Sequence, residues 1–187
     1  MPVTVLDPNT ALIVVDLQKG IAAMPGAHPI AGVVERSAAL AEAFRARKLP
    51  VVLVNVDAVA PGRTQAGPRV SAFPPGFDEL LPELNQQPSD HTVTKRTWGA
   101  FTGTDLEAYL KGKGVTQVVV TGVATSAGIE STARFAHELG FNVTLATDAM
   151  TDMSAEAHEN SISRIFPRMA ETGTTDEILV LLAKAEA

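Results

Sequence analysis

The chain has 187 residues, of which 45% are hydrophobic and 19% are charged. This length and composition predict one domain over residues 1–187 with a sizeable core, and they argue against extensive disorder. The 21 acidic residues outnumber the 15 lysines and arginines, and no basic run is present that would follow a phosphate backbone. We therefore expect no nucleic-acid partner.

The sequence also lacks cysteine, which narrows the possible chemistry, and it lacks a long apolar segment, which bears on location. With no cysteine in the chain, disulfides, thiolate metal ligands and a cysteine nucleophile are all excluded. The first residues lack a basic region followed by a long apolar stretch, and no apolar run approaches the ~20 residues of a membrane span. We expect a cytoplasmic protein with no membrane partner.

Strand and helix patterns alternate along the first part of the chain. Residues Ala11–Val15 form an apolar run typical of a buried strand, and Asp16 follows it directly. A carboxylate in that place carries a desolvation cost, so Asp16 is a candidate functional residue. A helical face then runs from Val33 to Phe44. The next predicted strand, Val51–Val56, ends at Asp57, a candidate for substrate binding.

Residues 58–90 interrupt this alternation. The segment holds half of the chain's 12 prolines and predicts a long irregular loop. Loops of this length in compact domains commonly serve as lids, binding loops or oligomer contacts, and a surface elaboration without catalytic meaning is the alternative. Arg63 lies on this loop and is our candidate for binding a substrate carboxylate, because a guanidinium can make two parallel hydrogen bonds to it.

A strand, turn, helix and strand follow one another within Gln117–Asp148, the most regular part of the sequence. Val118–Val120 is a β-branched run that predicts a strand covered on both faces, and Gly122 ends it. The turn over residues 122–128 is rich in small residues. Backbone N–H groups at the start of the next helix would therefore approach a ligand closely.

Capping patterns place further helices. Thr104–Glu107 has the spacing of a capping box and predicts the start of a helix. Ser154–Phe166 predicts another helix, and Met169–Thr172 a short extended segment. Thr174–Glu177 has capping-box spacing again and precedes a last helix at Ile178–Lys184.

Alternating strands and helices predict an α/β fold: a three-layer αβα sandwich with a mostly parallel sheet and right-handed crossovers. In such sheets ligands bind beyond the carboxyl ends of the strands. Asp16, Asp57, Lys95 and the turn at 122–128 all fall at or near such ends. A lysine beside Asp16 would favour its ionised form and burial its protonated form, so the pair would tune each other.

Three motifs resemble those of the isochorismatase-like hydrolases, a family that also contains nicotinamidases and N-carbamoyl amidohydrolases. They are VVDLQ at 14–18, KRTWGAF at 95–101 and TGVATSAGIESTA at 121–133, the last followed by ATDAMTD at 146–152. The likeness covers nearly the full length and implies a Rossmann-like fold. Family members commonly form dimers or tetramers, so the resemblance implies a homodimer or homotetramer.

The resemblance also implies a reaction. In cysteine-dependent members an aspartate, a lysine and a cysteine form the catalytic triad, and the first two correspond to Asp16 and Lys95. The third falls on Gly128, and without a thiolate no acyl-enzyme can form there. Isochorismatases of the family carry glycine at this place and cleave a vinyl ether. The resemblance thus implies acid-assisted hydrolysis of a vinyl ether such as isochorismate.

Further site residues follow from the same resemblance and from closeness to Lys95 in the sequence. The resemblance implies a cis peptide bond between Val123 and Ala124, and an oxyanion hole formed by the N–H groups of Ala124 and Gly128. Trp98 and Phe101 closely follow the candidate lysine and would wall an apolar pocket. A place in the core or in a subunit contact is the alternative for both aromatic residues.

Other functions stay open. Asp152 and His158 follow Ser126 in the acid-then-histidine order of a serine hydrolase, although the first glycine of the G-x-S-x-G motif is missing. Amidase-like hydrolysis of a different small substrate is another alternative, and a catalytically silent binding protein is a third. The four histidines are scattered, so we expect no metal and no cofactor, and a small molecule as substrate.

Overall fold

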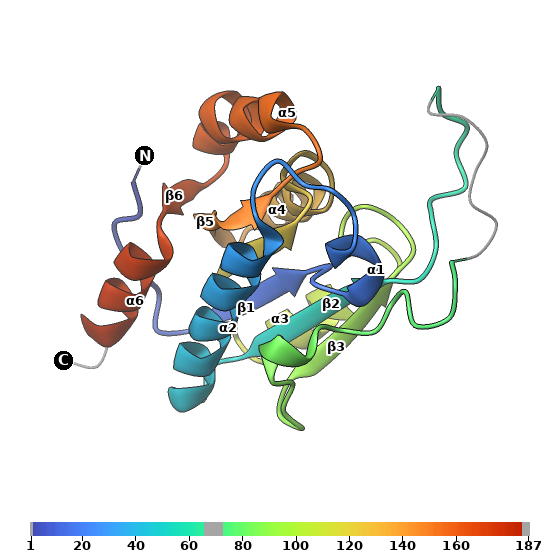
Figure 1. Ribbon diagram of the computed structural model, residues 1–187. Helices are drawn as coiled ribbons and strands as arrows, with labels where there is room; N and C mark the ends of the chain where they lie inside the picture. Colours follow the sequence, from blue (N-terminus) through green and yellow to red (C-terminus); the bar gives the residue numbers. More distant parts are fainter. Residues whose placement is uncertain (1, 66–72, 185–187) are drawn as a thin grey trace.

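The computed structural model describes residues 2–65 and 73–184. In this part of the chain six parallel strands form one sheet in the order β3-β2-β1-β4-β5-β6 (Figure 1). The α/β fold is confirmed, and the strand order is that of a doubly wound sheet whose order reverses between β1 and β4. The strands are β1 (Thr10–Val15), β2 (Val51–Val56), β3 (His91–Lys95), β4 (Gln117–Val123), β5 (Asn142–Thr151) and β6 (Glu171–Gly173).

Helices cover both faces of the sheet, because successive side chains of each strand point to opposite faces. Ile13 belongs to a core cluster that includes residues of α3 and α4, whereas Val14 belongs to a second cluster with residues of α2 and α6. Figure 1 shows α2 and α6 on the near side of the sheet. The helices are α1 (Lys19–Ala22), α2 (Ile30–Ala46), α3 (Leu106–Gly112), α4 (Glu130–Glu138), α5 (Ala155–Asn160) and α6 (Thr175–Lys184).

The two predicted capping boxes have different outcomes. At α6 the box is confirmed: the Thr174 N–H donates to Glu177 Oε2 at 2.8 Å, and the Glu177 N–H donates to Thr174 Oγ1 at 3.3 Å. At α3 only half of the box forms. Thr104 Oγ1 accepts from the Leu106 N–H at 3.4 Å, but Glu107 accepts a bond from Lys111 one turn further on, at 2.6 Å.

The segment between β2 and β3 is largely irregular where it is described, with a short 3₁₀ turn at Pro82–Leu84. Gln18 holds it against the sheet. Its Nε2 donates to Val56 O and Phe77 O at 3.0 Å each, and its Oε1 accepts from the Val56 N–H at 2.8 Å. The loop is thereby fixed at the carboxyl edge of the sheet. Within residues 2–65 and 73–184, the helices are too short or too polar to cross a membrane.

Candidate active site

Asp16 follows β1 directly and adopts a positive φ of 52°, a conformation that aspartate tolerates better than a β-branched residue. Its side chain is only 8% exposed. Oδ2 accepts a bond from Lys95, whereas Oδ1 is buried and has no hydrogen-bond partner among the described residues. Burial raises the pKa of Asp16 from 3.8 to about 6, against the charge and hydrogen bond of Lys95, which lower it.

Lys95 is the last residue of β3, and it reaches Asp16 past the end of the intervening strand β2. Its side chain is 2% exposed, and Nζ lies 2.7 Å from Asp16 Oδ2. Nζ also donates to Thr97 O at 3.1 Å. The structure therefore brings together the two charged residues that the sequence singled out, and both are buried.

The turn after β4 approaches the end of β1 very closely. Gly122 has a φ of +117°, and a Cβ built on it would lie 2.0 Å from Val15 O, so this position requires glycine. The Val123–Ala124 peptide bond is cis. A π-helical turn, Thr125–Ile129, then leads into α4. Such turns within helices are frequent at functional sites.

Gly128, within this π-helical turn, faces the candidate acid. A Cβ built on Gly128 would lie 3.4 Å from Asp16 Oδ2 and 3.0 Å from Val123 O. A side chain at this position would therefore point at the carboxyl group. The glycine leaves that space open and brings no nucleophile to it.

These groups line a cavity of about 190 Å³ at the carboxyl end of the sheet. Asp16 and Lys95 are its only charged lining residues in the described part of the chain, and Ala124 and Gly128 line it beside them. The remaining wall is mainly apolar, with Ile21, Val56, Val59, Phe73, Trp98 and Met153 among its members. Charges in such surroundings interact more strongly than they would in water.

The two aromatic candidates have different places. Trp98 lines the cavity and is 65% exposed, so it lies at the mouth. Phe101 is 8% exposed, belongs to the core cluster, and packs its ring 6.2 Å from that of Phe141. Phe101 does not line the cavity, because it packs against other core residues in the layer between the sheet and the helices.

The two other residues expected at the site lie outside the cavity wall. Arg63 is exposed and is not among the lining residues. Asp57 makes two bonds to Arg96, from Nε at 3.1 Å and from Nη2 at 3.2 Å. Asp57 is therefore neutralised beside the mouth, by a cation that the sequence did not single out.

The residues that suggested a serine hydrolase do not form its triad. The Ser126 hydroxyl donates to Asp152 Oδ2 at 2.8 Å, and His158 Nδ1 pairs with the Thr125 hydroxyl at 2.8 Å. No described contact joins Ser126 to His158, although a histidine must reach the serine to take its proton. Burial, followed by the neighbouring His28, lowers the pKa of His158.

Comparison with known proteins agrees with this geometry. The isochorismatase domain model matches residues 10–177. The chain belongs to the isochorismatase family. It is 44% identical to the uncharacterized isochorismatase family protein YecD of Escherichia coli O157:H7, over 91% of this chain and 95% of that protein. A solved isochorismatase family protein from Burkholderia thailandensis superposes with a TM-score of 0.92 at 39% identity, covering 96% and 98% of the two chains.

A more distant relative carries a named activity. The ureidoacrylate amidohydrolase RutB of Variovorax paradoxus is 28% identical to this chain, covering 100% of this chain and 86% of that protein. The named activity belongs to that relative.

Thr132 of α4 is a supporting residue that sequence reasoning missed. Its hydroxyl donates to Gly128 O at 2.6 Å and accepts from the Ala100 N–H at 3.1 Å. It thereby ties the segment after Lys95 to the turn after β4. Threonine within a helix gives no signal of such a role, because the pairing depends on a loop 32 residues earlier.

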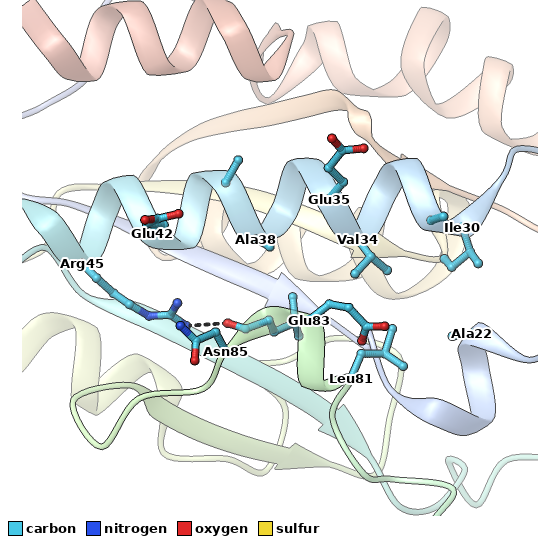
Figure 2. A pocket seen from close by; sticks show the side chains of 13 residues that line it. Ala22, Ile30, Val34, Glu35, Ala38, Glu42, Arg45, Leu81, Glu83 and Asn85 are labelled. Carbon is cyan, nitrogen blue, oxygen red and sulfur yellow. Dashed lines mark hydrogen bonds between the residues drawn. The ribbon is translucent and has the colours of Figure 1, made fainter.

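A larger groove of about 620 Å³ lies elsewhere, between α2 and the segment at 81–85 (Figure 2). Its carboxylates, Glu35, Glu42 and Glu83, are exposed. The Arg45 guanidinium there donates to Leu84 O at 3.1 Å and pairs with a neighbouring aspartate. The carboxylates that line this groove are exposed, and the buried Asp90 beside it is paired with Arg45. The smaller cavity, where Asp16 Oδ1 has no partner in the described chain, is therefore the candidate active site. In the described residues, no three histidine, aspartate or glutamate side chains group in a way that would hold a metal ion.

Proposed function

We propose that this isochorismatase-family hydrolase cleaves a vinyl ether such as isochorismate by acid-assisted hydrolysis at Asp16 and Lys95. The observation that carries the proposal is the asymmetry of the Asp16 carboxyl. Oδ2 is held by Lys95 at 2.7 Å, while Oδ1 is buried beside the cavity with no partner in the described chain. With its pKa raised to about 6, a useful fraction of this carboxyl is protonated near neutral pH.

The proposed reaction starts with proton transfer from Asp16 to the terminal CH₂ carbon of the vinyl group. The carbon that carries the ether oxygen becomes an oxocarbenium ion. A water oxygen bonds to this carbon and gives a proton to the Asp16 carboxylate, so that a hemiketal forms. The ether C–O bond of the hemiketal then breaks as the proton of its hydroxyl group is transferred to the departing oxygen, which yields pyruvate and a diol from isochorismate. No step requires a nucleophilic side chain, in agreement with Gly128.

The other groups act on charge and position. Lys95 stabilises the Asp16 carboxylate after proton transfer and binds negative charge on the substrate. The N–H groups of Ala124 and Gly128 are the proposed donors to a substrate oxygen. Trp98 at the mouth provides the proposed substrate contact. Asp57, Arg63 and Phe101 do not belong to this set, because none of them lines the cavity.

A substrate panel tests the proposal. The wild-type protein and the Asp16→Asn variant are assayed with isochorismate, simple vinyl ethers, amides and esters, and pyruvate release is followed with isochorismate. We expect vinyl ether cleavage by the wild type and its loss in the variant. Turnover of another substrate that depends on Asp16, without isochorismate cleavage, would reject the substrate. A wild type that turns over no compound would favour a binding protein.

The Gly128→Cys variant tests the choice of a vinyl ether over an amide. A thiol there would lie beside Asp16, so we expect it to add hydrolysis of N-carbamoyl amides, which the wild type lacks. Gly128→Ala is the matched control, because it adds the Cβ without the sulfur and meets the same close contact with Val123 O. Amide hydrolysis by the wild type would contradict the proposal and favour the activity named for RutB.

A further inference from the structure

Ser126, Asp152 and His158 remain unexplained by the proposed reaction. Ser126 belongs to the π-helical turn that carries Gly128, and Asp152 and His158 both contact this turn. Asp152 follows β5 directly and is 5% exposed. Its Oδ2 accepts from both the N–H and the hydroxyl of Ser126, at 2.7 and 2.8 Å, and its Oδ1 accepts from the Ser154 N–H at 3.2 Å. One buried carboxylate thus holds a residue of the π-helical turn by its main chain and its side chain.

His158 holds the preceding residue of the same turn. It comes from α5, is 5% exposed, and its Nδ1 lies 2.8 Å from the hydroxyl of Thr125, which is fully buried. The His28 ring lies against it, with ring centroids 4.6 Å apart, and His28 is fixed by a 3.0 Å contact between its Nδ1 and the Thr151 hydroxyl. The imidazole is therefore confined from two sides.

The helix that begins at this turn has no local cap. Ala124 occupies the N-cap position and makes no side-chain hydrogen bond to the turn. The first N–H groups of a helix need acceptors, and here the acceptor for Ser126 comes from the end of another strand. The turn's conformation therefore depends on contacts supplied by distant parts of the chain.

We propose that Asp152 and His158 are positioning residues for the reaction. By holding Ser126 and Thr125, they keep the N–H groups of Ala124 and Gly128 directed into the Asp16 cavity. The assignment rests on the proposed function, because turnover of isochorismate is used to measure it. The contacts by which Asp152 and His158 hold the turn are a property of the fold alone. Displacements of about 1 Å at such a site are enough to cost roughly 10²-fold in rate.

The first experiment compares two isosteric variants, Thr125→Val and Thr121→Val. Both threonines are fully buried, but the Thr125 hydroxyl contacts His158, whereas the Thr121 hydroxyl has no partner among the described residues. With isochorismate we expect Thr125→Val to lower kcat by roughly tenfold or more, with KM nearly unchanged. The reason is that the turn shifts while the rest of the substrate-binding cavity keeps its shape. Thr121→Val should behave as the wild type.

The second experiment uses the histidine itself. His158→Asn offers an amide group near the place of Nδ1, whereas His158→Gln offers one near Nε2. Because Nδ1 makes the contact with Thr125, we expect the asparagine variant to keep more of kcat than the glutamine variant. Equal losses in the two variants would indicate a packing role and overturn the assignment of His158.

The third experiment separates the two contacts of Asp152 with Ser126. Ser126→Ala removes the hydroxyl contact and leaves the main-chain bond, whereas Asp152→Asn also disturbs the acceptor of the Ser126 N–H. We expect the larger fall in kcat for Asp152→Asn. A greater loss in Ser126→Ala would overturn the positioning role and point to a nucleophilic serine.

Amide hydrogen exchange over residues 124–129 is a readout that needs no turnover. We expect faster exchange in Thr125→Val and Asp152→Asn than in Thr121→Val, with the central strands protected as in the wild type. Unchanged exchange, or faster exchange with wild-type kcat, would overturn the positioning proposal. If the wild type cleaves no vinyl ether, the proposed function fails, and exchange still decides whether these residues hold the turn.

Discussion

Two neighbouring cations, Lys95 and Arg96, each pair with an acid that follows a strand of the sheet, and the two pairs differ in burial. Lys95 contacts Asp16 at 2.7 Å, with side chains 2% and 8% exposed. Arg96 contacts Asp57 at 3.1 Å, with side chains 76% and 29% exposed. One pair lies inside the cavity wall, and the other lies on the surface beside the cavity mouth.

The difference shows that burial, rather than pairing, creates a candidate acid here. Desolvation raises the pKa of Asp16 to about 6 even though Lys95 favours its ionised form. Solvent and salt screen the outer pair, so such a pair adds little energy and tunes little chemistry. The comparison predicts that substitutions in the two pairs have effects of very different size.

The largest expected effect is that of Asp16→Asn, which removes the proton donor and keeps the shape of the side chain. We expect kcat for isochorismate to fall by about 10³-fold, the usual scale for a general acid. Lys111→Ala, which breaks an exposed pair within α3, is the control and should leave kcat unchanged. Steady-state rates of pyruvate release check this, and an Asp16→Asn variant with a tenth of the wild-type rate would remove Asp16 from the mechanism.

The next effect is that of Lys95→Met, which removes the buried cation and keeps an apolar chain of similar length. We expect kcat to fall by about 10²-fold, because the carboxylate formed on proton transfer loses its counter-charge. Lys95 lowers the pKa of Asp16, so its removal should raise that pKa and move the alkaline limb of the pH profile upward. A limb that moves downward would contradict the pairing.

We expect kcat/KM of the wild type to fall tenfold for each pH unit on the alkaline side of its pH profile. Asp16 must be protonated to act, and its pKa is raised to about 6. The value of kcat/KM should therefore be level below this pH and fall with rising pH above it. A limb at 3.8, the ordinary value for aspartate, would show that Asp16 is not desolvated in solution.

The smallest expected effect is that of Arg96→Gln, which removes the outer cation next to Lys95 in sequence. We expect kcat to stay within about twofold of the wild type and the pH limb to stay in place, because an exposed pair contributes little. Steady-state rates across the same pH range check this. A shift of the limb as large as that of Lys95→Met would show that the two pairs act on Asp16 together.

Much of the fold follows from local patterns. The apolar runs predict the strands, as with Ala11–Val15 inside β1 and Val51–Val56 as β2, and parallel strands necessarily bring their carboxyl ends to one edge. The capping box at Thr174–Glu177 is a local pattern as well. At Thr104–Glu107 the same pattern forms only in part, because Glu107 pairs with Lys111 instead of reaching back to the start of the helix.

The candidate site was only partly accessible to such reasoning. Asp16 stands out because a carboxylate directly after an apolar strand carries a desolvation cost, whereas Lys95 stands out through its motif and the family resemblance. Nothing local separates Trp98 from Phe101, yet one lies at the mouth and the other in the core. The order of Ser126 and His158 suggests a triad, but their hydrogen bonds go to other residues.

The sequence by itself determined the alternation of strands and helices, the acid after β1 and the glycine at position 128, since these depend on residue type and spacing. The motif indicated Lys95 as the partner of Asp16, but only the tertiary structure decided how deeply the pair is buried. Lys95 ends β3 with its side chain turned inward, whereas Arg96 is turned outward to solvent. The chemistry of Asp16 depends on the loss of water around this pair, which arises only when distant segments pack together.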